Sequence, residues 1–160
     1  MKHETFAKAL GKITSGLYLM TSKVEDDASP RDQMMLASWV QQVSFEPPML
    51  VVAVNHQRSV RDHIHTDSYF GLNIIGQQHS ELMKAPFQIK DLQAPFGELQ
   101  IHHSSNGVVK IAKASAFLEC KVQSIVSTGD HDLVIAEVTD GEVLQGDEPM
   151  AHVRKNGLSY

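Results

Sequence analysis

Cysteine, long apolar runs and a leader segment are scarce or missing in this chain of 160 residues. The sole cysteine, Cys120, excludes an internal disulfide and any cysteine-rich metal site. No run reaches the ~18 apolar residues that a membrane-spanning helix needs. The first residues also lack the long apolar stretch of a signal peptide. We therefore expect a cytoplasmic protein without a membrane partner.

A surplus of basic residues is also missing. Fourteen lysines and arginines stand against nineteen aspartates and glutamates, for a formal net charge of −5. No basic tract offsets this charge, which disfavours a nucleic-acid partner. The nine histidines are not accompanied by cysteines or an HExxH pattern, so we expect no metal site. No Gly-x-Gly-x-x-Gly follows a predicted strand, which excludes a Rossmann dinucleotide-binding domain.

In other respects the composition is ordinary for a globular protein, with 42% apolar and 21% charged residues. A length of 160 residues without repeats or linkers predicts a single domain, residues 1–160. Several stretches alternate apolar and polar residues with period two, which predicts strands. The expected strands cover residues 17–21, 36–46, 49–54, 69–75, 99–101, 108–111, 114–126 and 133–138.

Helices are expected to be few and short. They are predicted at residues 5–10 and 81–84, with a helical turn at 59–65. We expect a loop at residues 22–32 and an irregular segment at 90–97. Gly141 is expected to turn the chain, and Asn106-Gly107 predicts a hairpin turn. Many short strands with few helices are typical of an antiparallel barrel.

Residues 36–48 are the most informative stretch. The stretch begins as an extended segment, and Pro47-Pro48 removes two backbone donors and ends the strand. One side of the segment carries Met35, Ala37, Trp39, Val43 and Phe45. An apolar strand follows at once and ends in a polar, basic turn at residues 55–59.

This pair of strands suits a planar polar ligand with a phosphate tail. Ala37 and Ser38 are small enough for backbone N–H groups to approach the edge of a ring. Arg58 and Ser59 offer a positive charge and a hydroxyl for a phosphate. Side chains suited to a sugar-like chain are Gln41, Gln42 and Ser44. The residues alone leave open a plain structural alternative, since small polar residues on strands are common.

The run Leu-Ala-Ser-Trp-Val-Gln-Gln at residues 36–42, with the apolar strand after it, resembles the flavin reductase-like family. The likeness extends over nearly the whole chain. Its other parts are residues 15–21, residues 70–75, Gly129-Asp130-His131, and Arg154 with Tyr160 near the end. The run is most similar to the flavin reductase module at the carboxyl end of certain flavodiiron proteins. It differs from many members at Leu36, where they have Thr, and at Trp39, where they have a small residue.

The resemblance implies a mainly β fold, the FMN-binding split β-barrel with a few short helices. It implies a homodimer in which each FMN touches both chains. The implied activity is NAD(P)H-dependent flavin reduction, in which NADH or NADPH gives a hydride to the flavin. Electrons then pass to a free flavin, dioxygen or a protein acceptor. An FMN-binding electron relay without its own nicotinamide oxidation is the alternative.

The resemblance also assigns roles to residues. His131 would contact the reduced nicotinamide or the flavin edge, and Asp130 would orient its turn. Asn73 resembles a residue beside the isoalloxazine. Arg154 and Tyr160 resemble residues near the cofactor or the partner subunit. The other cofactor-binding residues expected are Leu36, Ala37, Ser38, Trp39, Val40, Gln41, Gln42, Ser44, Asn55, Arg58 and Ser59.

Overall fold

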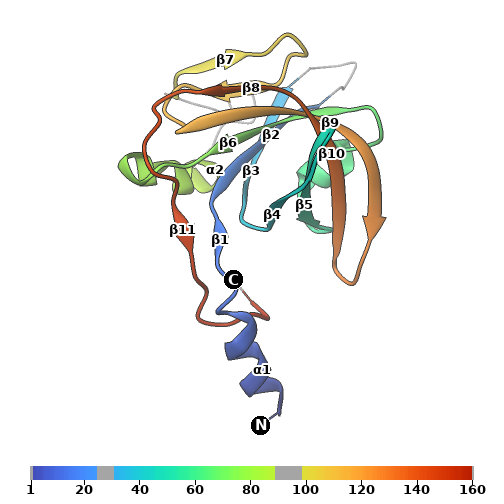
Figure 1. The fold of residues 1–160 in the computed structure, drawn as a ribbon, viewed down its shortest axis with the longest axis vertical. Helices are drawn as coiled ribbons and strands as arrows, with labels where there is room; N and C mark the ends of the chain where they lie inside the picture. Colours follow the sequence, from blue (N-terminus) through green and yellow to red (C-terminus); the bar gives the residue numbers. More distant parts are fainter. Residues whose placement is uncertain (1, 25–30, 89–98, 160) are drawn as a thin grey trace.

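A seven-stranded antiparallel sheet forms the body of the computed structural model, which describes residues 2–24, 31–88 and 99–159 (Figure 1). Its strand order is β3-β2-β6-β9-β10-β5-β4. The strands are β2 (Tyr18–Val24), β3 (Arg31–Ala37), β4 (Val40–Phe45), β5 (Pro48–Asn55), β6 (Tyr69–Ile74), β9 (Ala116–Ser127) and β10 (His131–Val143). The expected mainly β, split-barrel class with a few short helices is confirmed.

The two edge strands of this sheet, β3 and β4, are joined by only Ser38 and Trp39. Such a short link between opposite edges requires the sheet to curl until its edges meet. The Ala53 amide donates to the Trp39 carbonyl at 3.0 Å, which ties the link to β5. The single strand predicted over residues 36–46 is therefore wrong. The extended segment breaks where the chain crosses from one edge of the barrel to the other.

The barrel interior is filled by alternating apolar residues. On β5, Leu50, Val52 and Val54 are buried while their neighbours are partly exposed, as expected for a strand with one face on a core. Buried side chains of this main cluster also include Met20, Met35, Phe70, Leu72, Cys120, Val122 and Val134. A second cluster lies against η2 (Gln77–Lys84) and α2 (Ala85–Gln88) and contains Leu17, Leu19, Ile75, Leu82 and Ile111.

The alternation fails on β4, where the apolar side predicted from the sequence does not stay buried. Val43 is exposed, and Phe45 is 89% exposed. The register between β4 and β5 shifts between Gln42 and Ser44. Such an irregularity moves the following side chains off the face that a strict period of two predicts.

Gly141 does not turn the chain. Strand β10 continues through it to Val143, and Gly141 pairs with Leu118 on β9. A Cβ at Gly141 would lie 2.9 Å from Leu118 Cδ2, so the glycine allows a close side-chain approach within the strand. The loop predicted at residues 22–32 is also too long, because β2 reaches Val24 and β3 begins at Arg31. The rest of that loop, and most of the irregular segment at 90–97, lie outside the described residues.

The predicted hairpin around Asn106-Gly107 is confirmed by β7 (Ile101–His103) and β8 (Val109–Ile111). Asn73 holds this hairpin against the barrel. Its side-chain nitrogen donates to the carbonyls of Leu19 at 3.3 Å and Val109 at 3.2 Å, and its oxygen accepts from the Ile111 amide at 2.7 Å. Asn73 is fully buried, so its amide is used inside the fold.

The two ends of the chain form a projection that leaves the barrel at one end (Figure 1). Helix α1 (Lys2–Leu10) leads into β1 (Ser15–Gly16), which pairs with β11 (Ala151–His152) near the carboxyl end. We call α1, residues 11–13 and residues 153–158 the arm. The Gly157 amide donates to the Ala7 carbonyl at 2.8 Å. A Cβ at Gly157 would lie 2.1 Å from Leu10 Cβ, so the closeness of this packing requires glycine.

Cys120 lies in the middle of β9 and is fully buried. Burial raises the pKa of its thiol to about 12, so the thiol is protonated at physiological pH and unreactive. This agrees with a purely structural thiol. Among the residues described, no helix combines the length and apolar character that crossing a membrane requires.

Candidate functional site

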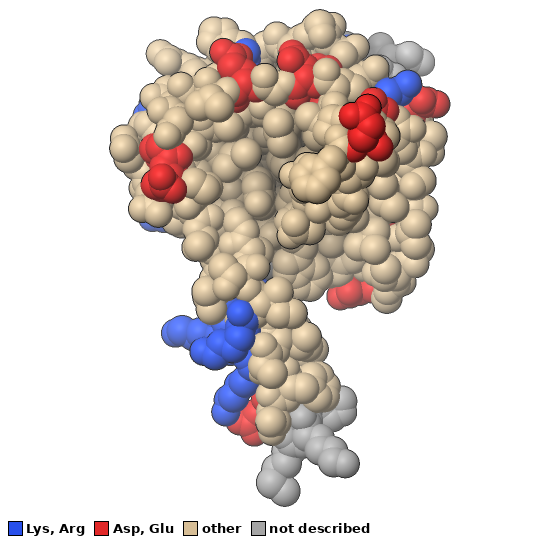
Figure 2. All heavy atoms as spheres, viewed as in Figure 1, with Lys and Arg blue, Asp and Glu red and all other residues tan. Residues whose placement is uncertain are grey.

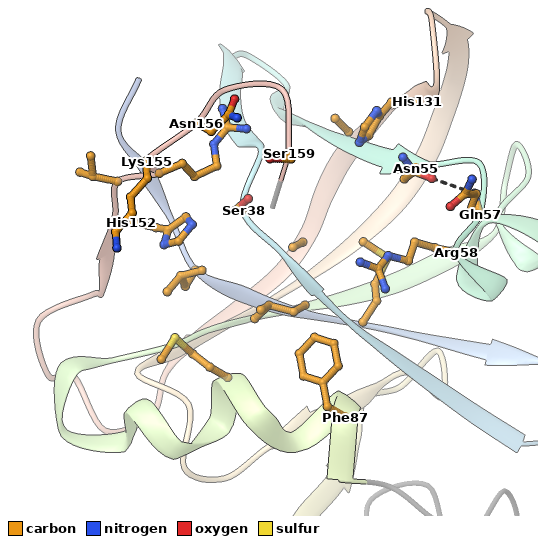
Figure 3. A pocket seen from close by; sticks show the side chains of 18 residues that line it. Ser38, Asn55, Gln57, Arg58, Phe87, His131, His152, Lys155, Asn156 and Ser159 are labelled. Carbon is orange, nitrogen blue, oxygen red and sulfur yellow. Dashed lines mark hydrogen bonds between the residues drawn. The ribbon is translucent and has the colours of Figure 1, made fainter. Parts of the chain in front are cut away.

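A pocket of about 880 Å³ opens between the barrel and the base of the arm (Figure 3). Several parts of the chain meet there. Among them are the end of β3, the end of β5 with the turn after it, the start of β10, and the segment after β11. Strands β5 and β10 are paired so that Asn55 stands opposite His131. The sheet register therefore brings two candidate residues far apart in sequence to the same rim.

The pocket is cationic although the protein is acidic. Its lining includes Arg58, His131, His152, Arg154 and Lys155. None of the described residues that line it is an aspartate or glutamate. Figure 2 shows lysine and arginine side chains gathered on the arm below the barrel, while most acidic side chains on this face lie over the barrel. Such a concentration of one sign of charge in a cleft favours an anionic ligand.

The floor between the charged groups is apolar. It is formed by Leu17, Met35, Leu36, Ala37, Ala53, Met83, Phe87 and Val153. Ala37 and Ser38 are both buried where the chain leaves β3. Small side chains on β3 and β5 leave room for a flat group to lie against the backbone. An apolar surface bordered by a few polar groups is typical of pockets that hold organic cofactors.

The turn at residues 55–58 forms one end of the pocket. The Gln57 amide donates to Asn55 Oδ1 at 2.9 Å, and the Arg58 amide donates to the Asn55 carbonyl at 3.0 Å. These bonds bend the chain so that Asn55, Gln57 and Arg58 all line the pocket (Figure 3). Ser59 borders a smaller adjoining cavity of about 290 Å³, together with Arg58.

The helix that follows, η1 (Ser59–His63), is a 3-10 helix of five residues. The residue before it, Arg58, has an extended backbone and makes no side-chain capping bond. Ser59 is thus the first residue of η1. Arg58 is the residue in this turn that can neutralise an anion.

Trp39 contacts both His131 and a cationic side chain, beside the rim that His131 shares with Asn55. The rings of Trp39 and His131 have centroids 4.9 Å apart, and the Arg154 guanidinium carbon lies 4.8 Å from the Trp39 ring centre. His131 is largely buried, and its Nδ1 donates to Asp130 Oδ1 at 2.7 Å. This hydrogen bond lowers the pKa of the Asp130 carboxyl below its usual range. Neighbours on two sides thus fix the orientation of the His131 ring.

The structure brings together only part of the predicted site. Its lining contains the expected Leu36, Ala37, Ser38, Asn55, Arg58, His131 and Arg154. Val40, Gln41, Gln42 and Ser44 lie on the edge strand β4, outside the lining of this pocket. The Gln41 and Gln42 side chains are exposed and bond to backbone carbonyls of their own strand. Trp39 is not among the lining residues, but it contacts two residues that are, His131 and Arg154.

Asn73, which was expected beside the flavin ring, is buried in the barrel, where its amide bonds to Leu19, Val109 and Ile111. Tyr160 lies outside the described residues. No local pattern in the sequence pointed to Met83, Phe87 and His152, which also line the pocket. They come from η2, α2 and β11, which meet the barrel only through tertiary packing.

Comparison of folds finds solved structures that share the architecture of this chain. Streptomyces globisporus C-1027 NADH:FAD oxidoreductase superposes with a TM-score of 0.81 at 18% identity, over 92% of this chain and 87% of that chain. A structure of that oxidoreductase in complex with NAD and FAD fragments gives a TM-score of 0.79 at 19% identity, over 92% and 86% of the two chains. At these identities the likeness shows the fold alone.

The sequence comparison then gives the family. Residues 10–157 match the model of the flavin reductase like domain, so the chain belongs to that family. A Nostoc sp. protein with the name "Putative diflavin flavoprotein A 6" is 39% identical to this chain. The match covers 96% of this chain and 27% of the Nostoc protein. Diflavin flavoprotein A 1 of Synechocystis sp. is 33% identical over 96% of this chain, which is 26% of its own length. The chain thus spans about a quarter of these relatives.

Proposed function

We propose that this chain binds FMN and reduces it with NADH or NADPH. The observation that carries the proposal is the pocket itself, with an apolar floor, five cationic or titratable basic side chains and no acidic side chain among its described lining residues. A flavin mononucleotide has the matching chemistry, a flat ring system with a phosphate on a flexible chain. Family membership supports the same assignment.

The two ends of the pocket suit different parts of the ligands. Arg58 stands at one end, and His152 with Lys155 stands across the pocket from it (Figure 3). We assign the FMN phosphate to the turn at residues 55–58. The ring would lie along Ala37 and Ser38. The phosphates of the nicotinamide nucleotide would then meet His152, Lys155 or Arg154.

The chemistry that FMN supplies when bound is acceptance of a hydride at its N5 position and release of the electrons to an acceptor. The protein then needs no side-chain acid or base at the reacting atoms. Its task is to hold two rings in contact and exclude water. His131, oriented by Asp130 and Trp39, is placed to position the nicotinamide or the flavin edge. Backbone amides at the end of β3 would stabilise negative charge on a reduced ring.

Anaerobic mixing tests this proposal. The protein is incubated with FMN, freed of unbound flavin, and mixed with NADH or NADPH under argon. We expect a yellow protein whose visible flavin band bleaches with one nicotinamide oxidised per flavin. A protein that stays colourless after incubation with FMN would refute flavin binding. The rate with each nucleotide gives the preference between NADH and NADPH.

An electron relay is the second candidate, and the curated relatives favour it. Both are diflavin flavoproteins of which this chain matches only about a quarter. A module of that kind could hold FMN and pass electrons to a protein acceptor without oxidising a nicotinamide itself. Bound FMN that dithionite reduces but neither NADH nor NADPH bleaches would support the relay.

We further propose that the protein is a homodimer in which the arm packs on a second copy. Among the described side chains of α1, only Ala7 is buried, and the apolar Phe6 and Leu10 are exposed. Exposed apolar side chains of the arm are Phe6, Leu10, Ile13, Val153 and Leu158. Clustered apolar groups on a surface mark protein interfaces. Val153 also lines the pocket, so a second copy on the arm would border the ligand.

Ile13→Glu is expected to weaken dimerisation at least about tenfold, because it places an unpaired charge among apolar groups at the interface. Ile13 is 62% exposed in the single chain, so the substitution leaves the fold of the monomer intact. Sedimentation velocity over a range of concentrations measures the change. Lys12→Glu adds a negative charge to the adjacent exposed position and serves as the control. Equal association of the two variants and the parent chain would contradict an interface at the arm.

A single domain over residues 1–160, a cytoplasmic location and a protein electron acceptor stay predictions.

A further inference from the structure

One buried carboxylate next to the site is not part of the pocket lining. Asp132 follows His131 on β10, and its side chain is only 3% exposed. Its Oδ1 accepts from His56 Nε2 at 3.0 Å, and its Oδ2 accepts from Arg61 Nε at 2.7 Å. The hydrogen bond with His56, aided by Ser127 and Arg61, lowers the pKa of Asp132. The buried group is therefore charged and held by two basic side chains.

These two partners lie on either side of the pocket-lining residues of the turn. His56 precedes Gln57 and Arg58, and Arg61 follows them within η1. The backbone adds two further bonds: the His56 amide donates to the Asp130 carbonyl at 3.0 Å, and the Arg61 amide donates to the Arg58 carbonyl at 2.9 Å. The turn is thus tied to the start of β10 before Arg58 and after it.

We propose that Asp132 is a positioning residue that fixes the turn at residues 55–58, so that Arg58 faces the phosphate of the bound flavin. This inference rests on the proposed function, because it names a device that serves the same site. Asp132 makes no contact with the ligand space and acts through His56 and Arg61.

If Asp132 only stabilised the fold, its substitution would give a different result from the one that a positioning role predicts. General loosening of the barrel would weaken every flavin. Misplacement of Arg58 would weaken only ligands that carry the phosphate. Riboflavin is FMN without its phosphate, so the ratio of the two affinities separates the cases.

The experiment measures the dissociation constants of FMN and riboflavin for the parent chain, Asp132→Asn, Arg58→Ala and the double variant. We expect Asp132→Asn to weaken FMN about tenfold and riboflavin less than about twofold. The double variant is expected to lose no more FMN affinity than Arg58→Ala alone, because Asp132 acts through Arg58. Asp62→Asn makes the same change at an exposed position next to Arg61 and should leave both constants unchanged.

An unchanged ratio of FMN to riboflavin affinity in Asp132→Asn overturns the inference, whether both affinities hold or both fall together. Should that variant not fold, Arg61→Gln removes one partner at a side chain that is 45% exposed, and the same loss of preference for FMN is expected. A parent chain that binds no flavin refutes the proposed function instead. The two failures are therefore distinct.

Discussion

Replacing Arg58 by alanine is expected to weaken FMN binding about 10- to 100-fold while riboflavin affinity stays nearly constant. A hydrogen bond between charged groups contributes about 1.5–3 kcal/mol, which gives that range. Arg58 is the basic residue of the turn at 55–58, because Asn55 and Gln57 beside it are neutral. Two other basic groups of the lining, His152 and Lys155, lie across the pocket from it (Figure 3). Quenching of flavin fluorescence measures both constants.

Two variants make this result specific. Arg58→Lys keeps the charge but not the planar pair of donors, and should fall between the parent chain and Arg58→Ala. Lys121→Ala removes a positive charge outside the pocket, where Lys121 pairs with Asp67, and should not change FMN affinity. An Arg58→Ala variant that binds FMN as tightly as the parent chain would place the phosphate elsewhere.

The second large effect is expected on the rate of flavin reduction. His131→Ala should slow hydride transfer from NADH or NADPH about 10- to 100-fold, since small displacements of two reacting rings cost rates of that order. The His131 ring is fixed by Asp130 at 2.7 Å and by Trp39 at a centroid distance of 4.9 Å. Its loss removes the wall against which the rings are aligned. Stopped-flow absorbance under anaerobic conditions gives the rate.

A positioning role for His131 requires that FMN affinity fall much less than the rate. His131→Asn keeps one donor near the same place and should recover part of the loss. His65→Ala is the control, because His65 is exposed and lies outside the pocket lining. If His131→Ala reduced FMN at the parent rate, His131 would have no role in hydride transfer.

Local patterns were enough to predict most strands. The strand expected at residues 114–126 is β9 (Ala116–Ser127), and the one at 49–54 lies within β5 (Pro48–Asn55). Both signals depend on alternation within one strand, which the sequence displays directly. The Asn106-Gly107 hairpin was likewise predictable, because two adjacent residues determine the turn.

Features that depend on distant parts of the chain were not predictable in this way. The break at Ser38 exists because the edges of the sheet meet there, and no local pattern marks that closure. Glycine is typical of turns, but Gly141 is needed because the Leu118 side chain packs against it from another strand. Asn73 was expected beside the ligand from the family resemblance, whereas the hairpin of β7 and β8 uses its amide inside the fold.

The candidate site shows the same division. Arg58 and His131 could be proposed from their turns, and the structure brings both to one pocket. The role of Asp132 depends on two partners located 76 and 71 positions away along the chain, so it could not be read from its surroundings in the sequence.

The arm gives the ligand a route to influence quaternary structure. Residues 153–156 line the pocket, and Gly157, next to them, is bonded to α1 through Ala7. Any free-energy coupling between pocket occupancy and subunit pairing must be reciprocal. If pairing tightens flavin binding, flavin tightens pairing by the same factor, and dilution releases both together. Saturation curves measured at nanomolar and micromolar chain concentrations would then fail to superimpose.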